Sequence, residues 1–197
     1  MKRSIFPFLT LITCTGICFT GCVDEKSYYK HSMVSGFHSP IVVRKPTTAT
    51  EMAKWLSDSS NVTWLPRQVS GRVDGATALD NIQQAAAGHA AKMSSYGTAP
   101  GGYVRLDPRM LRAMMTLVEE GYRFRVTSIA GASHSRNSLH YQGLAFDVDQ
   151  INGVKVEYGS PYYHKFMARC RELGATETFG PGSRGHSGHV HAAWPRP

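Results

Sequence analysis

The sequence of 197 residues predicts an α+β fold in which a small, mostly antiparallel sheet is flanked by helices. Two observations in the second half of the chain lead to it. Segments with apolar residues at helical spacing alternate with short stretches in which every second residue is apolar. The pair Asn152-Gly153 lies between two such stretches and is typical of the tight turn that joins antiparallel strands. Helices interleaved with hairpin-joined strands characterise the α+β class.

The start of the chain predicts an export signal at residues 1–21. Lys2 and Arg3 precede an apolar stretch, as in secretory signals. Pro7 and Gly16 interrupt this stretch, which is too short for a transmembrane helix of roughly 20 apolar residues. We therefore exclude residues 1–21 from the fold.

The Phe-Thr-Gly-Cys sequence that ends at Cys22 resembles a bacterial lipobox, in which the cysteine is lipidated after cleavage, although Phe19 stands where leucine is usual. Val23 follows in place of the aspartate associated with retention at the inner membrane. These residues predict a lipoprotein of the bacterial cell envelope at the periplasmic face of the outer membrane. An ordinary cleaved secretory signal is the alternative. The polar residues 22–48 are interpreted as a tether.

Charge limits the partners that we expect. The formal net charge of +8 falls by two, to +6, when Lys2 and Arg3 are removed. A moderately basic surface suits the anionic polymers and lipid headgroups of a cell envelope. The sequence contains no basic cluster with interleaved aromatic residues, which argues against nucleic-acid binding.

The four cysteines do not suggest a disulfide framework. Cleavage would remove Cys14 and Cys18, and lipidation would occupy Cys22, so Cys170 would remain alone. We interpret Cys170 as a small buried hydrophobic residue of a helix. The sequence has no Cys-x-x-Cys spacing, so a metal would have to be bound by histidine and carboxylate.

Residues 49–100 are interpreted as an N-terminal helical extension. We expect a short helix at 50–58, an extended stretch at 61–69 and a helix at 76–94. The Gly-rich sequence TAPGG then marks a soft boundary to a second domain, 101–197, although the length also fits a single domain.

The first elements after this boundary are a helix and a strand. Asp107 followed by Pro108 is a helix N-cap with proline at the first helical position, and Gly121 supplies the stop. Four apolar residues of this helix recur at core spacing: Leu111, Met114, Met115 and Val118. The strand covers 122–130, with three alternating residues on one face: Phe124, Val126 and Ser128.

Two more elements follow the hairpin. Ser160-Pro161 opens a helix that Gly174 closes, with four residues at core spacing: Tyr163, Phe166, Met167 and Cys170. The sequence GHVHAAW, residues 188–194, is typical of a short terminal strand.

The stretch SLHYQGLAFDVD, residues 138–149, combines core and polar positions. Side chains alternate along a strand, so one face carries Leu144, Phe146 and Val148. The opposite face carries a small residue and two carboxylates, Ala145, Asp147 and Asp149. Gly143 lets the backbone turn from the loop that holds His140.

Two further histidines lie near the C-terminus. His189 and His191 flank Val190 and project from the same face of a strand, with Cα atoms roughly 6.5–7 Å apart. Two imidazoles and the Asp147 carboxylate can converge on one cation and leave a fourth position for water, as catalytic zinc requires.

Together these residues form the pattern Ser138-x-His140-x-x-Gly143-x-Ala145-x-Asp147, followed by His189-x-His191. The pattern resembles that of the zinc D,D-peptidase family, which includes D-alanyl-D-alanine carboxypeptidases and dipeptidases, murein endopeptidases, certain phage endolysins and the zinc-binding fold of hedgehog proteins. The resemblance covers residues 101–194 and implies the α+β zinc fold of that family. Residues 23–100 resemble no family that we can name.

The resemblance implies one Zn²⁺ per chain, with His140, Asp147 and His191 as its ligands. It gives His189 the catalytic position, as a base or as a stabiliser of the oxyanion. It gives Ser138 the position that contacts the peptide backbone or the terminus of the substrate.

Two positions depart from the family pattern. Gly188 stands where some members carry a glutamate base, which places the chain with the His-x-His variety. The Gly-Tyr-Arg-Ser sequence that holds a substrate-binding arginine is missing, and Arg136 is the nearest candidate to replace it. His186, in a Gly-Ser-rich loop, is expected to border the cleft and bind substrate. Other candidates for lining the cleft or orienting a ligand are Ser133, His134, Ser135, Tyr141, Asp149 and Trp194.

The activity that the resemblance implies is zinc-dependent hydrolysis of D-amino-acid-containing bonds in peptidoglycan stem peptides, by a D,D-carboxypeptidase or a D,D-endopeptidase. One alternative is a non-catalytic, zinc-stabilised module that binds peptidoglycan or protein. Another is a non-haem iron oxygenase, because two histidines and a carboxylate also form its facial triad. The His-x-Asp spacing typical of such oxygenases is absent, since six residues separate His140 from Asp147.

Overall fold

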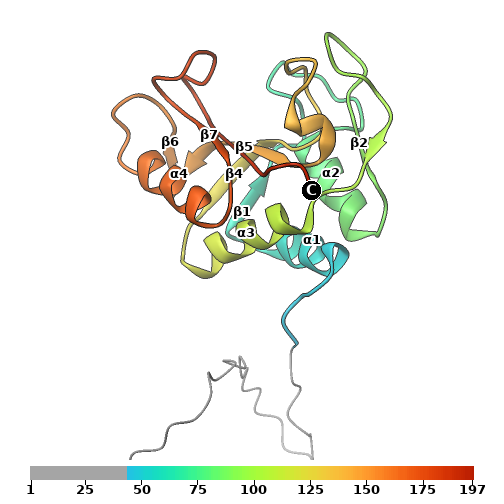
Figure 1. Cartoon of the computed structure of the whole chain (residues 1–197), viewed down its shortest axis with the longest axis horizontal. Coiled ribbons are helices and arrows are strands. Elements are labelled where there is room, and N and C mark those ends of the chain that lie inside the picture. The colour runs from blue at the N-terminus through green and yellow to red at the C-terminus, as the bar shows by residue number, and fades with distance from the viewer. Residues whose placement is uncertain (1–43) are drawn as a thin grey trace, which may run out of the picture. The chain divides into compact units, whose positions relative to one another are not determined.

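The computed structural model describes residues 44–197. The predicted export signal, the predicted lipidation site Cys22 and most of the predicted tether lie outside this range. Pro46–Pro197 form one compact unit, which contains the predicted boundary at residue 100 (Figure 1). Within the described residues, no helix combines the length and the apolar composition of a membrane span.

A mixed sheet of six strands lies at the centre of this unit. Five strands follow one another in the order β1-β4-β5-β8-β7, and β6 pairs with β5. β1 runs parallel to β4, and the other pairs are antiparallel. The bounds are β1 Val62–Trp64, β4 Phe124–Ser128, β5 Ala145–Ile151, β6 Val154–Lys155, β7 Glu177–Phe179 and β8 Val190–Ala193. A separate two-stranded sheet consists of β2 (Ala91–Lys92) and β3 (Tyr103–Val104).

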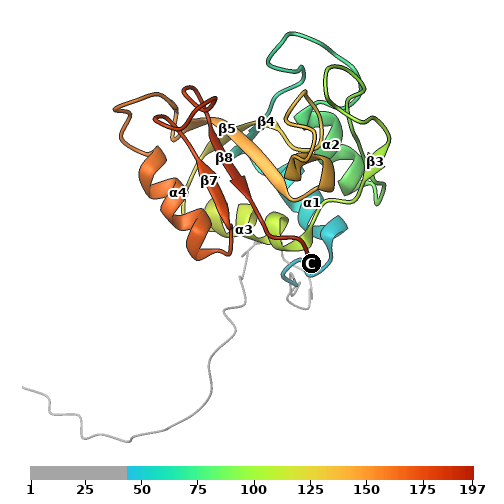
Figure 2. The same ribbon diagram turned by 45° about the horizontal axis from the view of Figure 1, so that its top comes forward.

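Four α-helices of the described unit flank the sheet: α1 (Ala49–Asp58), α2 (Ala78–Ala86), α3 (Pro108–Glu119) and α4 (Tyr163–Glu172). α1 packs against α2 and α3, and α4 packs against β7 and β8 (Figure 2). Aromatic rings connect the sheet to α4, with Phe124 5.5 Å from Phe166 and 6.5 Å from Phe146. The predicted α+β class is therefore confirmed.

The predicted core positions are buried. Phe146 and Val148 of β5 are fully buried, as are most of the apolar residues predicted for α3. Cys170 is also fully buried, as predicted, and burial raises the pKa of its thiol to about 12. The cysteine is therefore a protonated core residue.

One predicted helix is too long. The helix expected at 76–94 ends at Ala86, because Gly88 adopts a φ of +81° that is incompatible with a right-handed helix. Ala91–Lys92 then form β2, so the apolar spacing of this part of the sequence belongs to a strand. The predicted helices at 50–58 and before Gly121 and Gly174 are present, although the last begins only at Tyr163.

The hairpin predicted at Asn152-Gly153 is confirmed. Asn152 has a φ of 51° and Gly153 a φ of 79°, and both central residues of this type of turn need a positive φ. The Asn152 side chain also accepts a hydrogen bond from the backbone N–H of Arg123 at 2.9 Å. The turn joins β5 to β6.

A β-bulge in β4 changes the face to which Ser128 belongs. Val126 pairs with Val148, but Ser128 pairs with Asp147, because the register shifts between these two residues of β4. Val148 and Asp147 project from opposite faces of β5. The prediction that Ser128 shares the core face of Phe124 and Val126 is therefore wrong.

The chain turns at Gly143 before it enters β5. Gly143 has a φ of 69°, and its carbonyl accepts a hydrogen bond from the backbone N–H of Asp107 at 2.9 Å. A side chain at this position would collide with the backbone carbonyl of Arg105. The site therefore requires glycine both for its backbone conformation and for the close approach of the segment before α3.

α3 begins at the predicted N-cap. Asp107 Oδ1 accepts a hydrogen bond from the backbone N–H of Arg109 at 2.7 Å, and Pro108 occupies the first turn. Burial opposes ionisation of Asp107, but hydrogen bonds from the side chain and backbone of Arg109 outweigh it and hold the pKa of this carboxyl below its usual value.

Gly143→Ala is expected to destabilise the protein more than Gly121→Ala does. Both glycines have a positive φ, which costs about 1–2 kcal/mol for alanine. The added methyl group meets no atom at Gly121, whereas at Gly143 it collides with the Arg105 carbonyl, which adds about 1–3 kcal/mol. Urea unfolding of the two variants measures the difference. Equal losses of unfolding free energy in the two variants would contradict the prediction, because the collision at Gly143 would then add no cost.

Asp107→Ala is expected to lower the free energy of unfolding by about 1 kcal/mol at pH 7, because the helix loses its N-cap. The folded-state pKa of Asp107 is depressed, so the stabilisation is present above its unfolded value of about 3.9 and is lost as the pH falls through the folded pKa. Urea unfolding at pH 7 and pH 3 tests both statements. Asp58→Ala is the control, since its ion pair with Lys54 is 3.2 Å long but largely exposed.

Candidate metal centre

A row of side chains across four strands forms the base of the site. The strand register places Ser128 opposite Asp147, Asp147 opposite His191, and His191 opposite Phe179. Residues directly opposite each other in antiparallel strands project from the same face of the sheet. β4, β5, β8 and β7 lie side by side in the sheet (Figure 2), and they therefore present these four side chains on one face.

A short 3₁₀-helix, η1 (Leu139–Gln142), adds His140 to this row. Ser138 caps η1, because its Oγ accepts a hydrogen bond from the backbone N–H of His140 at 3.3 Å, and Gly143 ends it. The His140 side chain is fully buried, and its Nδ1 donates to the Ile129 carbonyl at 2.5 Å. Since a carbonyl can only accept, Nδ1 carries a proton, and Nε2 faces the sheet.

Three potential ligand atoms meet at this point. His140 Nε2 lies 3.2 Å from Asp147 Oδ1 and 3.1 Å from His191 Nδ1, and His191 Nδ1 lies 2.9 Å from the same carboxylate oxygen. All three residues are buried. The structure therefore brings together the three residues that the sequence pattern selects as metal ligands, although 44 residues separate Asp147 from His191 along the chain.

Asp147 and His140 shift each other's pKa towards the charged forms. Burial raises the pKa of a carboxyl group, but His140 and His191 outweigh burial and hold the pKa of Asp147 well below its usual value. Burial likewise opposes protonation of His140, yet the charge and hydrogen bond of Asp147 raise its pKa. Asp147 is therefore a carboxylate, and it is the negative centre of the cluster.

His134 is a further histidine at the site. Its Nε2 lies 3.1 Å from Ser128 Oγ and 3.0 Å from the Gly131 carbonyl, and its ring stacks on His140 with centroids 3.8 Å apart. Burial, followed by the neighbouring His140, lowers the pKa of His134 to about 3, so the ring is neutral at physiological pH. His134, His140 and Asp147 have ligand atoms within 4.8 Å of one another, and this group could hold a metal ion.

His189 and His186 lie beside the ligand cluster but outside its buried centre. His189 Nε2 is 4.0 Å from Asp147 Oδ2, and its side chain is 29% exposed. Burial lowers the pKa of His189, while the Asp147 charge partly opposes this shift. His186 is partly exposed, and its ring centroid lies 4.9 Å from that of His189 and 5.8 Å from that of His191. The His186 ring thus lies near both His189 and His191.

Two residues of β7 also surround His191. Phe179 stacks on the His191 ring with centroids 5.8 Å apart, and Glu177 Oε2 lies 4.0 Å from His191 Nε2. Sequence analysis did not find these two residues, because the short strand β7 has no clear alternation of apolar residues. The pairing of β7 with β8 places both residues beside His191.

The remaining candidates have different roles. Ser138 is occupied as the cap of η1, and Arg136 is exposed in the same loop. Tyr141 is buried, and its hydroxyl accepts a hydrogen bond from the backbone N–H of His134 at 2.7 Å. Asp149 forms a two-point ion pair with Arg125, with both bonds 2.7 Å long, and no described hydrogen bond joins it to a histidine of the site.

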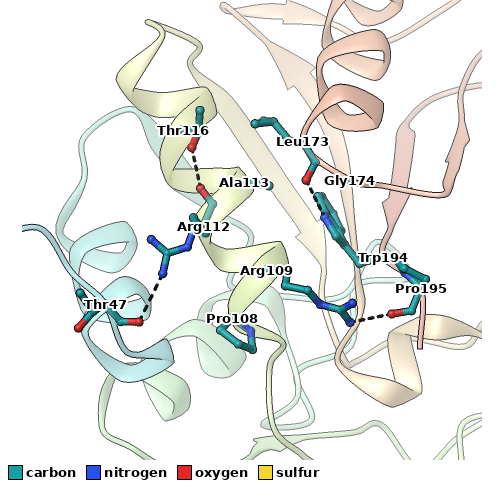
Figure 3. Close-up of a pocket in the computed structure, with 10 residues that line it drawn as sticks. All are labelled: Thr47, Pro108, Arg109, Arg112, Ala113, Thr116, Leu173, Gly174, Trp194 and Pro195. Atoms are coloured by element: carbon teal, nitrogen blue, oxygen red, sulfur yellow. Dashed lines mark hydrogen bonds between the residues drawn. The ribbon is translucent and has the colours of Figure 1, made fainter. Parts of the chain in front are cut away.

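A groove of about 680 Å³ lies elsewhere on the unit (Figure 3). α3 forms one wall with Arg109 and Arg112, and Trp194 and Leu173 lie opposite. The Trp194 indole donates to the Leu173 carbonyl at 3.1 Å, so this candidate cleft residue belongs to the groove. The groove and the cluster around Asp147 have no lining residue in common.

Known proteins do not identify the family of this chain. No protein-family model matches the chain, and no similar curated protein or solved structure was found. The family resemblance of the motif therefore stays a prediction, and a function has to be inferred from the chemistry of the residues around Asp147.

Proposed function

We propose that the chain is a zinc-dependent peptidase that hydrolyses D-amino-acid-containing bonds of peptidoglycan. The observation that carries this proposal is the meeting of His140 Nε2, Asp147 Oδ1 and His191 Nδ1 within 3.2 Å of one another. His189 stands next to these atoms and takes no part in the triangle, so a reactive group is available beside the ligands.

The distances support a single tetrahedral ion. Ligand atoms 2.0–2.1 Å from a tetrahedral zinc lie about 3.3–3.4 Å from one another. The measured separations of 2.9, 3.1 and 3.2 Å are slightly shorter and need only a small expansion. Two imidazoles and one carboxylate, with a fourth position left for water, form the ligand set of a catalytic zinc site.

His191, rather than His134, completes this ligand set in our proposal. The lone pair of an imidazole lies in the plane of the ring, so two rings that are stacked face to face direct their lone pairs along separate parallel planes and cannot share one ion. The His134 and His140 rings are nearly parallel, at 10°, whereas the His191 ring is inclined by 58° to that of His140. His134 Nε2 is moreover engaged by the Gly131 carbonyl. We assign His134 a packing role behind His140.

The chemistry of the proposed reaction is amide hydrolysis. A zinc ion in this site would lower the pKa of its water to about 7 and polarise the scissile carbonyl. His189, 4.0 Å from Asp147 Oδ2 and partly exposed, can move a proton or stabilise the developing charge. Asp147 keeps its carboxylate form, and its Oδ1 lies 2.9 Å from the other proposed ligand atom, His191 Nδ1.

The substrate assignment rests on the motif and on the surface beside the cluster. Arg136 is exposed in the loop that precedes η1, and His186 is partly exposed, with its ring 4.9 Å from that of His189. Cationic and hydrogen-bonding groups at these positions suit the carboxylate terminus of a stem peptide. A lipid anchor at Cys22 would hold the enzyme in the cell envelope, where this substrate occurs.

Metal content distinguishes the proposed ligands from their neighbours. His140→Ala, Asp147→Ala and His191→Ala are each expected to lose zinc on dialysis, because two ligands cannot hold the ion. His134→Ala and His189→Ala are expected to retain one zinc per chain. The exposed His89→Ala is the control. Elemental analysis measures the zinc content of each variant. Loss of zinc in His134→Ala together with its retention in His191→Ala would overturn the ligand assignment.

Products of peptidoglycan digestion test the activity. The zinc-loaded protein is expected to release terminal D-alanine from defined stem peptides, or to cleave cross-linked dimers, as identified by mass spectrometry. His189→Ala is expected to keep its zinc and to lose about 10²–10⁴-fold in rate, the usual contribution of a general acid or base.

Two results would contradict the peptidase proposal. Full zinc occupancy without cleavage of any stem peptide or cross-link would favour the non-catalytic binding module. Preferential retention of iron, with oxygen consumption, would favour the oxygenase. Both outcomes would leave the ligand assignment intact, since all three functions use the same residues.

A further inference from the structure

One peptide group connects the candidate metal centre to the N-terminal part of the unit. It is the peptide between Ile129 and Ala130, in the loop that follows β4. Its carbonyl, on Ile129, accepts the Nδ1–H of His140 at 2.5 Å. Its N–H, on Ala130, donates to the side-chain oxygen of Asn81 at 2.8 Å. Asn81 belongs to α2, 59 residues before His140 in the chain.

The whole connection lies in the interior. Asn81, Ile129, Ala130 and His140 are all 0% exposed. No water can replace a lost partner without rearrangement, so a free Ala130 N–H would carry a desolvation penalty. In such a dry environment hydrogen bonds on the two ends of one peptide also polarise each other, so the Asn81 bond strengthens the Ile129 carbonyl as an acceptor.

The orientation of the Asn81 amide is determined by its partners. Its Nδ2 donates to the Lys92 carbonyl at 2.9 Å, while its Oδ1 accepts from Ala130. A flipped amide would face a carbonyl with its oxygen and an N–H with its nitrogen, which loses both bonds. Lys92 is itself held in β2 and by Gln84, whose side-chain oxygen accepts from the Lys92 N–H at 2.8 Å.

A second contact fixes the same loop two residues later. Ser94 Oγ accepts from the Ala132 N–H at 2.9 Å and donates to Asp74 Oδ2 at 2.6 Å. Ala132 has a φ of 66°, an unfavourable conformation for alanine that needs such support. Residues before Gly101 thus hold the loop at both Ala130 and Ala132.

We propose that Asn81 is a positioning residue for the metal ligand His140, which it orients through the Ile129–Ala130 peptide. The segment before Gly101 is then part of the metal centre and not an appended extension. The role of His140 as a ligand rests on the proposed function, but the orientation of its ring does not. Partners that orient a ligand histidine typically change metal affinity by about 10–100-fold.

The experiment compares Asn81→Leu with Gln84→Leu in the full chain. Each change removes one side-chain amide of α2 with two backbone partners. Asn81 bonds to Ala130 and Lys92, whereas Gln84 bonds to Lys92 and Gly75 and has no partner in the loop among its described hydrogen bonds. Circular dichroism and urea unfolding first establish that both variants are folded at the temperature of the assay.

The first readout is zinc affinity, measured by competition with a chromophoric chelator. Asn81→Leu is expected to weaken zinc binding about tenfold or more, which is the usual effect of removing a group that orients a ligand histidine. Gln84→Leu is expected to stay within about threefold of the unmodified protein. Equal weakening by both variants would overturn the proposal, because the effect would then follow general destabilisation.

The second readout needs no metal. The Nδ1–H proton of His140 is buried and bonded to Ile129 O, so in the metal-free protein it should exchange slowly with water and give an observable NMR signal. Asn81→Leu is expected to speed this exchange at least tenfold, and Gln84→Leu to leave it unchanged. Unchanged exchange in Asn81→Leu would overturn the proposal.

A second variant covers the case in which Asn81→Leu does not fold. Asn81→Asp keeps the shape and the acceptor for Ala130, and a carboxyl group that burial keeps protonated can still donate to the Lys92 carbonyl, so this variant should retain the zinc affinity and the slow His140 exchange. A tenfold loss of either in a folded Asn81→Asp would overturn the proposal. If the unmodified protein binds no zinc, the proposed function fails, while the exchange measurement still decides the role of Asn81.

Discussion

The antiparallel pairing of β5 with β8 is the constraint on which the site depends. It places Asp147 directly opposite His191, and β4 and β7 extend the same row to Ser128 and Phe179. Directly opposite side chains on antiparallel strands are the closest neighbours that a sheet provides. A shift of this register by one residue would turn His191 to the core face and put Val190 or Ala192 beside Asp147. The candidate metal centre therefore requires one alignment of these two strands.

This pairing buries a carboxylate, and the surrounding elements compensate for the desolvation. Asp147 is 5% exposed, and a buried carboxylate is tolerated only when it is paired and hydrogen-bonded. The two histidines provide this pairing without a metal, since both lie within 3.2 Å of the same oxygen. The site is thus preorganised: the groups that would bind an ion hold one another in place, and the core residues on the opposite face of β5 keep the strand fixed.

The third proposed ligand, His140, comes from outside the sheet, and its orientation depends on distant parts of the chain. Gly143 permits the turn from η1 into β5 and the close approach of the segment before α3, and the Ile129 carbonyl fixes a proton on His140 Nδ1. That carbonyl lies in a loop supported from α2 and from Ser94. The residues before Gly101 match no motif, yet they contact the loop that orients His140. In this way a segment without chemistry of its own can control the geometry of a reactive site.

The sequence by itself determined the local features. The cap at Asp107, the turn at Asn152-Gly153, the need for glycine at position 143 and the two-residue spacing of the C-terminal histidines follow from backbone stereochemistry and side-chain period, which depend only on near neighbours. The tertiary structure decided which strands pair. Contacts between residues far apart in the chain produce four features of the site region. They are the strand β7, the bulge that turns Ser128 towards Asp147, the ion pair of Asp149 with Arg125, and the support from Asn81. Such contacts depend on the packing of the whole unit, and a local pattern carries no information about them.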